Sequence, residues 1–230
     1  MYTIYVADDE KSIRDLIKTF LQKEDMDVKT FETGDQLLLA FMERQADLVV
    51  LDVMMPGTDG FSIARKIRQV SQVPIFLLTA LDSDQNYIDG FKTGIDDYFT
   101  KPFSPIKLAL RIKAILARQP FTTTVTELTE LSFEGLRLMS APPQLMIKDH
   151  IISLTNTEYK VMKLLLTEPN RSVSREQLLD EVWGIDSDVE TRVTDDTMKR
   201  LRQKLRQVDS HVIIETVWGY GFKLSKKEVS

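Results

Sequence analysis

The 230-residue sequence contains no cysteine and only two histidines. The absence of cysteine excludes disulfide bonds and thiolate metal ligands, and it agrees with a reducing compartment such as the cytoplasm. The sequence also lacks a long apolar run and a charged-then-apolar leader, so it predicts neither a membrane span nor a secretory signal. We therefore expect a cytoplasmic protein with no membrane partner.

An excess of basic charge is lacking as well, since the net charge is −5. Residues 1–118 carry 15 basic and 18 acidic side chains (−3), and residues 119–230 carry 15 and 17 (−2). This charge balance argues against binding of nucleic acid through the overall charge of the protein. Any contact with nucleic acid has to come from a local basic surface.

The first half of the chain alternates between two kinds of segment. Short β-type runs are expected at 3–7, 27–31, 48–52, 74–80 and 98–101, and helices at about 13–21, 35–45, 61–69, 83–93 and 106–117. Five strands that alternate with helices predict an α/β domain, with a parallel sheet covered on both faces.

The third of these runs, Leu48–Asp52, has four apolar residues followed directly by an aspartate and a Pro-Gly and Asp-Gly loop. A continuous apolar run bounded by turn residues is typical of a strand buried on both faces. Asp52 is therefore expected at the carboxyl end of such a strand, where ligands bind in open parallel sheets. A solvated aspartate at the start of a loop is the simpler alternative for this residue alone.

Polar residues lie at the ends of four predicted strands: Asp8, Asp9, Asp52, Thr79 and Lys101. Three carboxylates at one edge raise one another's pKa unless a cation compensates, and oxygen ligands suit Mg²⁺. A lysine and a hydroxyl beside them can hold a phosphoryl group while a carboxylate attacks it. Each residue alone has an ordinary structural explanation, but all five together favour a phosphoryl-transfer site.

The pattern changes after residue 118. Residues 119–126 lack a helical period and predict a linker, and the alternation in 127–154 predicts short antiparallel strands. Thr155–Glu158 form a capping box that begins a helix, a second helix is expected from Ser174, and a long one over about 189–207. Residues 211–224 predict a hairpin turned at 218–221. Three helices and a terminal hairpin predict an α+β winged-helix domain over 127–226.

The long helix is basic, and a solvated face is the usual explanation of such a run. Its spacing predicts a buried stripe and an opposite, exposed face. The stripe is Thr194, Met198, Leu201, Leu205 and Val208. The exposed face is Arg192, Asp196, Lys199, Gln203 and Arg206, with Arg200 flanking it and Arg202 also expected to reach DNA. Arginine and glutamine on a rigid helix are common readers of guanine and adenine in the major groove, so this helix is a candidate reader of double-stranded DNA.

Residues 1–118, with the acidic pair, the strand ending in Asp52 and the Lys101-Pro102 dipeptide, resemble the receiver domain of two-component response regulators. The resemblance implies a flavodoxin-like sheet of order 2-1-3-4-5 and a sensor histidine kinase as phosphate donor. It also implies site residues: Asp52 as phosphoacceptor; Asp8, Asp9, Asp52 and the Met54 carbonyl around Mg²⁺; Thr79 and Tyr98 as switch residues; and Lys101 as a phosphate contact.

Residues 127–226 resemble the winged-helix effector domain of the OmpR/PhoB class. The similarity lies in LTNTEY (154–159), SREQLL (174–179), VWG (182–184), RLRQKL (200–205) and TVWGYGF (216–222). It implies a DNA-reading helix, a wing on the adjacent minor groove and a loop after Trp183 that touches RNA polymerase. Thr197, Asp196 and Trp218 depart from the commonest form, where Trp218 replaces a wing arginine.

The same resemblance implies a homodimer when Asp52 is phosphorylated. Two ion pairs between subunits are predicted, Asp97 with Arg111 and Asp96 with Arg118, whereas Tyr87 and Lys107 replace a third pair. The dimer face is expected to be formed by the predicted helices at 83–93 and 106–117. Its apolar part is expected to be Ile88, Phe91, Leu108 and Ile112.

Two alternatives stay open at this stage. One is a regulator that binds DNA without phosphorylation, against which the intact acidic pocket argues. The other is an aspartate-nucleophile phosphatase or phosphotransferase, which needs a further acid or base to hydrolyse its intermediate. No such residue is evident, because both histidines, His150 and His211, follow the linker. The sequence thus favours a transcription regulator over an enzyme.

Overall fold

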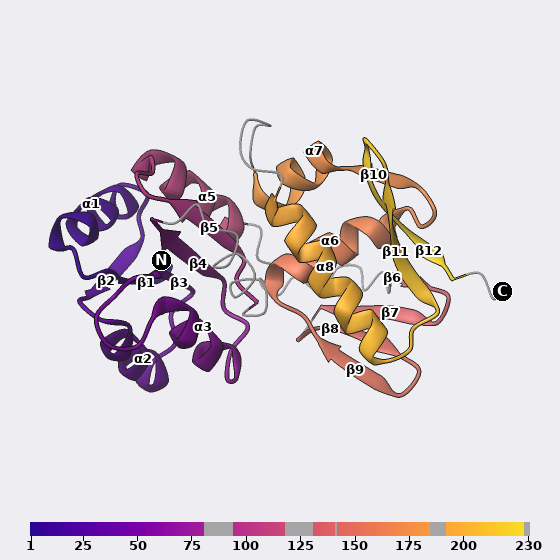
Figure 1. The fold of residues 1–230 in the computed structure, drawn as a ribbon, viewed down its shortest axis with the longest axis horizontal. Coiled ribbons are helices and arrows are strands. Elements are labelled where there is room, and N and C mark those ends of the chain that lie inside the picture. The colour runs from indigo at the N-terminus through magenta and orange to yellow at the C-terminus, as the bar shows by residue number, and fades with distance from the viewer. Residues whose placement is uncertain (81–93, 118–130, 141, 185–191, 228–230) are drawn as a thin grey trace. The chain divides into compact units, whose positions relative to one another are not determined.

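The computed structural model describes residues 1–80, 94–117, 131–140, 142–184 and 192–227. The chain divides into two compact units, Met1–Ala117 and Arg118–Ser230, which are drawn in indigo to magenta and in orange to yellow in Figure 1. The predicted linker, 119–126, and the helix predicted at 83–93 lie outside the described residues.

The first unit is a parallel α/β sheet of strand order β2-β1-β3-β4-β5, as predicted. Its strands are β1 (Thr3–Ala7), β2 (Asp27–Phe31), β3 (Leu48–Asp52), β4 (Ile75–Thr79) and β5 (Asp97–Thr100). Its described helices are α1 (Lys11–Gln22), α2 (Gly34–Glu43), α3 (Gly60–Arg68) and α5 (Pro105–Ala117). Helices α1 and α5 pack together on one face of the sheet, and α2 and α3 cover the other (Figure 1).

Burial explains why the apolar runs became the central strands. Every residue of β3 and β4 is buried, because helices cover both faces of the sheet. The register then sets the site. Ala7 of β1 pairs with Leu51, and Asp52 pairs with Leu78 of β4. The residues that follow β1 and β3, and the end of β4, therefore meet at one edge.

The second unit is the predicted winged helix. An antiparallel sheet of order β6-β7-β8-β9 comes first, with β6 (Leu131–Phe133), β7 (Leu136–Ser140), β8 (Pro143–Ile147) and β9 (His150–Ser153). Helix α6 (Asn156–Thr167), strand β10 (Ser172–Ser174), the short α7 (Arg175–Leu178) with its π-helical continuation η1 (Leu179–Trp183), and α8 (Arg192–Gln207) follow. Strands β11 (Val212–Val217) and β12 (Gly221–Lys226) complete a second sheet, β10-β12-β11.

Helix α6 begins at the predicted capping box: the Thr155 hydroxyl accepts from the Glu158 N–H, and the Glu158 carboxylate accepts from the Thr155 N–H. Trp183 is fully buried in the core of this unit, and Gly184, with φ of +71°, ends η1 in the left-handed region. The start predicted for the long helix at 189 cannot be compared, since 185–191 lie outside the described residues. Among the described residues, no helix is long and apolar enough to cross a membrane.

Candidate functional site

The acidic pocket of the first unit is centred on the Lys101 ammonium. Its Nζ lies 2.8 Å from Asp8 Oδ2, 3.2 Å from Asp52 Oδ1 and 3.8 Å from Glu10 Oε1. Asp8 and Asp52 are buried, whereas Asp9 is exposed. The carboxylates of Asp8, Asp9 and Asp52 each offer an oxygen within 4.8 Å of the others. The structure thus brings together the predicted carboxylates and the predicted lysine.

Burial controls the protonation of this pocket. Desolvation raises the pKa of Asp52 to about 6, although the Lys101 charge acts in the opposite direction. Burial lowers the pKa of Lys101, but its hydrogen bond to Asp8 and the charge of Asp52 outweigh that effect and raise it overall. The lysine therefore stays charged, and Asp52 is a carboxylate at neutral pH. An ionised aspartate that is only partly neutralised is suited to nucleophilic attack on a phosphoryl group.

The pocket also fits a divalent cation, since its donor set consists of carboxylate oxygens, the ligands that Mg²⁺ takes in proteins. Met54 lies in the loop after β3, and its side chain is exposed while its backbone N–H bonds to the Asp52 carboxylate. That bond holds the carboxylate against the loop. The predicted role of the Met54 carbonyl as a ligand stays a prediction.

Thr79 and Tyr98, the predicted switch residues, are both buried on neighbouring strands. Thr79 is the last residue of β4, and its carbonyl accepts the Lys101 N–H at 2.6 Å. Tyr98 pairs with Leu77, two residues before Thr79. The two residues therefore lie on β4 and β5, the pair of strands that Lys101 follows directly, and their movement on phosphorylation stays a prediction.

Arg14 of α1 is a site residue that the sequence reasoning missed. Its guanidinium is buried and donates to the Asp8 and Asp9 carbonyls at 2.7 and 2.9 Å, and to Glu32 at 3.2 Å. It thereby fixes the backbone that carries the acidic pair. The available signal was its position, because Arg14 stands three residues before Ile17 and seven before Leu21 on the buried stripe of the helix.

Close packing shapes the loop after β3 as well. A Cβ built on Gly60 lies 2.2 Å from the Asp52 carbonyl oxygen, so no side chain fits there. The absence of a side chain lets the first turn of α3 approach the end of strand β3. Asp35 of α2 holds the same loop, since its carboxylate accepts from the Thr58 hydroxyl at 2.8 Å and from the Thr58 N–H at 3.2 Å.

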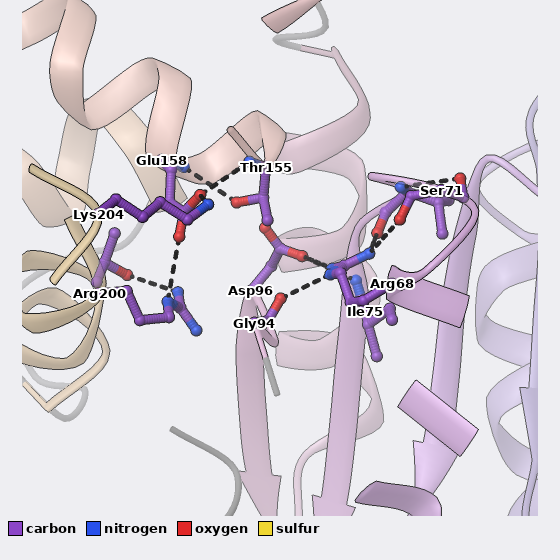
Figure 2. Close-up of polar contacts among 11 residues, drawn as sticks. Arg68, Ser71, Ile75, Gly94, Asp96, Thr155, Glu158, Arg200 and Lys204 are labelled. Carbon is purple, nitrogen blue, oxygen red and sulfur yellow. Dashed lines mark hydrogen bonds and ion pairs between the residues drawn. The ribbon is translucent and has the colours of Figure 1, made fainter. Parts of the chain in front are cut away.

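Three of the four residues predicted to form ion pairs between subunits have partners within the chain. The Arg111 guanidinium lies 2.8 Å from Asp97, and both side chains are buried. Asp96 is bound 2.6 Å from Arg68, whose Nε also donates to the Gly94 carbonyl (Figure 2). Arg118, Tyr87, Ile88 and Phe91 lie outside the described residues. Exchange of these ion pairs between subunits stays a prediction.

The predicted apolar part of this face needs a correction. Leu108 and Ile112 are buried within the unit, so they cannot form an exposed surface. The prediction assigned both residues to the wrong side of the helix, because they belong to the stripe of α5 that packs inward. Ile106 and Leu110, one turn apart on the same helix, are exposed and provide an outward apolar surface.

Helix α8 has the predicted two faces. The stripe of Thr194, Met198, Leu201 and Leu205 is buried, and Val208 is half-buried. On the opposite side Lys199, Gln203 and Arg206 are exposed and Asp196 is half-buried, while the Arg192 side chain lies outside what the structure describes. Arg202 is half-exposed and is tied to β11 through the Ile214 carbonyl, at 2.7 Å. The helix therefore presents a polar and basic surface, as expected.

Arg200 is the exception, because the prediction that it flanks the exposed face is wrong. Its side chain is buried, with Nε 3.5 Å from Glu158 Oε1 and Nη2 donating to the Thr197 hydroxyl (Figure 2). A buried carboxylate draws the guanidinium inward, because isolated buried charges are costly and are usually paired. In this conformation Arg200 is in no position to read a base.

Glu158 is the second residue whose importance the sequence reasoning missed. Beyond its capping role, its buried carboxylate binds Lys204 Nζ at 2.6 Å as well as Arg200 (Figure 2). Burial raises the pKa of Glu158, but the two cations outweigh that effect and lower it overall. The carboxylate therefore joins α6 to two consecutive turns of α8. The capping box was evident in the sequence, but the ion pairs of the Glu158 carboxylate with residues more than 40 positions away were not.

Comparison with known families matches both units. Residues 4–113 match the family described as "Response regulator receiver domain", and residues 148–224 match "Transcriptional regulatory protein, C terminal". A relative 37% identical to the chain over 232 residues covers 97% of this chain and 95% of its own length. The chain therefore belongs to the OmpR/PhoB class of response regulators, which regulate transcription. That relative is the transcriptional regulatory protein SrrA of Staphylococcus aureus.

Solved structures agree over nearly the whole chain. The response regulator DrrB, a Thermotoga maritima OmpR/PhoB homologue, is 32% identical with a TM-score of 0.52, and covers 98% of this chain and 99% of its own. A mutant of RitR is 25% identical with a TM-score of 0.74, and covers 98% and 100%. The similarity to these two structures therefore extends over both units of the chain.

Proposed function

We propose that Asp52 accepts a phosphoryl group from a sensor histidine kinase and that this acyl phosphate controls DNA binding in the cytoplasm. The observation that carries the proposal is the contact of Lys101 Nζ with both Asp52 and Asp8, beside the exposed Asp9. We assign residues 1–118 to the receiver, 119–126 to the linker and 127–226 to the DNA-binding domain.

In the proposed reaction, an Asp52 carboxylate oxygen forms a bond to phosphorus while the bond to the donor nitrogen of the kinase breaks. The Lys101 ammonium then forms an ion pair with a phosphoryl oxygen. The Thr79 hydroxyl donates to another phosphoryl oxygen, and Tyr98 packs behind it. Asp9, Asp52 and the Met54 carbonyl, with help from Asp8, would hold Mg²⁺, which would supply positive charge to balance that of the phosphoryl oxygens.

One experiment separates this function from its alternatives. The protein is incubated with acetyl phosphate and Mg²⁺, and its intact mass and the release of phosphate are followed. A stable gain of one phosphoryl group supports the receiver function, and rapid turnover without a lasting adduct indicates a phosphatase. DNA affinity that is the same with and without the adduct indicates a regulator that does not depend on phosphorylation.

Magnesium affinity is expected to depend on pH below about 6. The pKa of Asp52 is raised, so this carboxyl is protonated below about pH 6 and ionised above it. Because a metal ligand has to be deprotonated, the dissociation constant for Mg²⁺ should rise about tenfold for each pH unit below that value and stay nearly constant above it. Calorimetric titration from pH 5 to 8 measures the effect. Asp52→Asn removes the titrating ligand and should give a flatter profile.

The proposed partner of the second unit is double-stranded DNA. Gln203, exposed on α8, is proposed to reach base edges, and the exposed Lys199 is proposed as a phosphate contact. Arg192 and Asp196 belong to the same predicted face. Arg202 is proposed as a phosphate contact, because β11 holds its guanidinium at the margin of this face. Contact with RNA polymerase is assigned to the loop after Trp183, where 185–191 lie outside the described residues.

We propose that phosphorylated protein dimerises through the face of α5 and binds two DNA half-sites. Since Asp97 and Arg111 are already paired within each chain, exchange of these pairs between subunits adds little net electrostatic energy. The exposed apolar residues Ile106 and Leu110 are expected to contribute more. The dimer should therefore be modest in affinity and only mildly sensitive to salt.

Leu110→Lys is expected to weaken this dimer at least tenfold without unfolding the receiver. The side chain of Leu110 is 55% exposed, so lysine fits the monomer but places a charge within the proposed interface. Sedimentation of the phosphorylated protein across a salt series measures the effect. Leu39→Lys, on α2 and 71% exposed, is the matched control. If the two variants dimerise equally well, the interface lies on another face of the receiver.

A further inference from the structure

Helix α8 is held by charged side chains on both flanks of its exposed face. At about 3.6 residues per turn, Arg200 and Arg202 project roughly 160° apart around the helix axis, so they leave the helix from opposite flanks. Lys199 and Gln203, the exposed residues proposed to contact DNA, lie between these flanks. The rotation of the helix about its own axis therefore depends on what holds each flank.

The first flank is held by Glu158 of helix α6. Its Oε1 lies 3.5 Å from Arg200 Nε, and its Oε2 lies 2.6 Å from Lys204 Nζ (Figure 2). The Lys204 ammonium also donates to the Ser153 carbonyl at the end of β9, at 2.8 Å. One carboxylate and two cations thus join α8 to a neighbouring helix and to the end of a strand.

The opposite flank is held by Arg202. Its Nε donates to the Ile214 carbonyl and its Nη2 to the Thr216 hydroxyl, each at 2.7 Å. The same guanidinium lies 5.6 Å from the ring centre of Phe222 on β12. Because the two flanks are held by separate groups, a rotation of α8 in either direction has to disrupt contacts with α6, with β11 or with both.

The rotation of α8 determines what its exposed side chains can reach. An α-helix has a radius of about 5–6 Å with its side chains, so a rotation of roughly 20° moves a side-chain tip by about 2 Å. A hydrogen bond to a base edge tolerates less than this, since donor and acceptor have to lie about 2.7–3.2 Å apart. A lysine on its flexible stem can still follow a phosphate. A rotated helix should therefore lose sequence preference before it loses general affinity for DNA.

Glu158 itself cannot touch DNA, because it is only 1% exposed. A carboxylate in a DNA-binding unit repels the phosphates, so its removal should strengthen binding to every duplex if its influence is electrostatic alone. If the carboxylate instead holds the reading helix in place, its removal should weaken binding to the preferred duplex. The two roles thus predict changes of opposite sign.

We propose that Glu158 is a positioning residue for DNA recognition, which sets the rotation of α8 through Arg200 and Lys204 and thereby determines which sequence the protein prefers. The proposal rests on the proposed function, because it requires that α8 read duplex DNA. It also gives the buried Arg200 a role other than base contact: the guanidinium links the carboxylate of α6 to the helix that reads.

Selectivity for one duplex over another tests the proposal. The first probe is the duplex that the acetyl-phosphate-treated full-length protein selects from a random pool, and the second has the same base composition in scrambled order. Glu158→Gln should weaken binding to the selected duplex about tenfold, as one mismatched base pair does, and leave binding to the scrambled duplex unchanged or slightly tighter. Urea unfolding followed by tryptophan fluorescence identifies conditions in which each variant is folded.

Lys204→Met is the second variant, because it removes one link to α8 and keeps the buried pair of Glu158 with Arg200. It removes a positive charge, so its affinity for both duplexes should fall. The ratio of the two affinities should also fall, which loss of charge alone would not produce.

Two controls separate positioning from charge and from stability. Glu168→Gln removes the same charge from an exposed pair with Arg171 and should keep the wild-type ratio of affinities. Ile147→Ala removes a buried side chain from β8 and leaves the groups that hold α8 unchanged. It should unfold at a lower urea concentration and keep the wild-type ratio while folded. An equal loss of selectivity in folded Ile147→Ala would attribute the effect to stability and overturn the proposal.

A double-mutant cycle tests whether Arg200 acts through Glu158. If it does, the losses of selectivity in Glu158→Gln and Arg200→Gln should not add in the double variant. Additive losses would mean that the two residues act independently, which overturns the proposal. Wild-type selectivity in folded Glu158→Gln also overturns it, while the proposed function stands. A wild-type protein that prefers no duplex overturns both.

Discussion

Asp52→Asn is expected to abolish the incorporation of acid-labile phosphate from acetyl phosphate in the presence of Mg²⁺. The amide keeps the shape of the side chain but lacks the carboxylate nucleophile, and it should weaken the proposed Mg²⁺ site formed with Asp8 and Asp9. Removal of Mg²⁺ from the wild-type protein should have the same effect. Intact mass spectrometry measures the effect: the wild-type protein should gain the mass of one phosphoryl group, and the variant should gain none.

The Asp52→Asn protein should remain folded, since the ionised form of this residue does not stabilise the fold. Its pKa is raised from the ordinary value of 3.8 to about 6, so the stability that it contributes decreases as pH rises from about 4 to 6. Asp15→Asn, on the exposed face of α1, is the matched control and should accept phosphate normally. Phosphate incorporation at the wild-type level by Asp52→Asn would exclude this residue as the acceptor.

Glu158→Gln should lower the free energy of unfolding of the second unit by about 3 kcal/mol, because it leaves the buried Arg200 without its carboxylate. Glutamine keeps an acceptor for the Thr155 N–H, so the capping box survives and the change isolates the charge. Both tryptophans belong to this unit, and urea unfolding followed by their fluorescence therefore reports on it alone.

The pH dependence gives a second readout of the same substitution. Because the pKa of Glu158 is lowered by Lys204 and Arg200, its stabilising effect is fully present above the unfolded-state value of 4.5 and is lost as pH falls through the folded-state pKa. The difference in the free energy of unfolding between the wild-type protein and Glu158→Gln should therefore become smaller at acidic pH. Glu168→Gln, which loses only an exposed pair with Arg171, is the control and should change stability by less than about 1 kcal/mol. If both variants unfold at the same urea concentration, the buried cluster contributes no net stability.

The sequence predicted the fold because its local signals agree with its tertiary structure. The apolar runs 48–52 and 74–80 became the two fully buried strands, and the capping box at Thr155 begins α6. The convergence of Asp8, Asp52 and Lys101 was predictable because parallel strands deliver their carboxyl ends to one edge. Strand order itself came from the family resemblance and not from periodicity.

Long-range pairing and helical phase could not be predicted in the same way. Arg200 looks exposed on a helical projection until a buried carboxylate from α6 is known to lie beside it. Leu108 and Leu110 are both apolar residues of α5, and only the packed structure shows that the first is buried and the second exposed. Arg14 was passed over because an arginine within an apolar stripe is usually assigned to solvent.

The missing side chain at Gly60 has a consequence for protein engineering. Because a single methyl group would overlap the Asp52 carbonyl oxygen, a library that diversifies the loop from Met54 to Asp59 should keep position 60 constant. Loops transplanted from related receivers have to bring their own glycine at the matching distance from the aspartate. A chimera that shifts this spacing by one residue would place a side chain against the end of β3, and we expect it to lose the proposed phosphorylation although both parent domains fold.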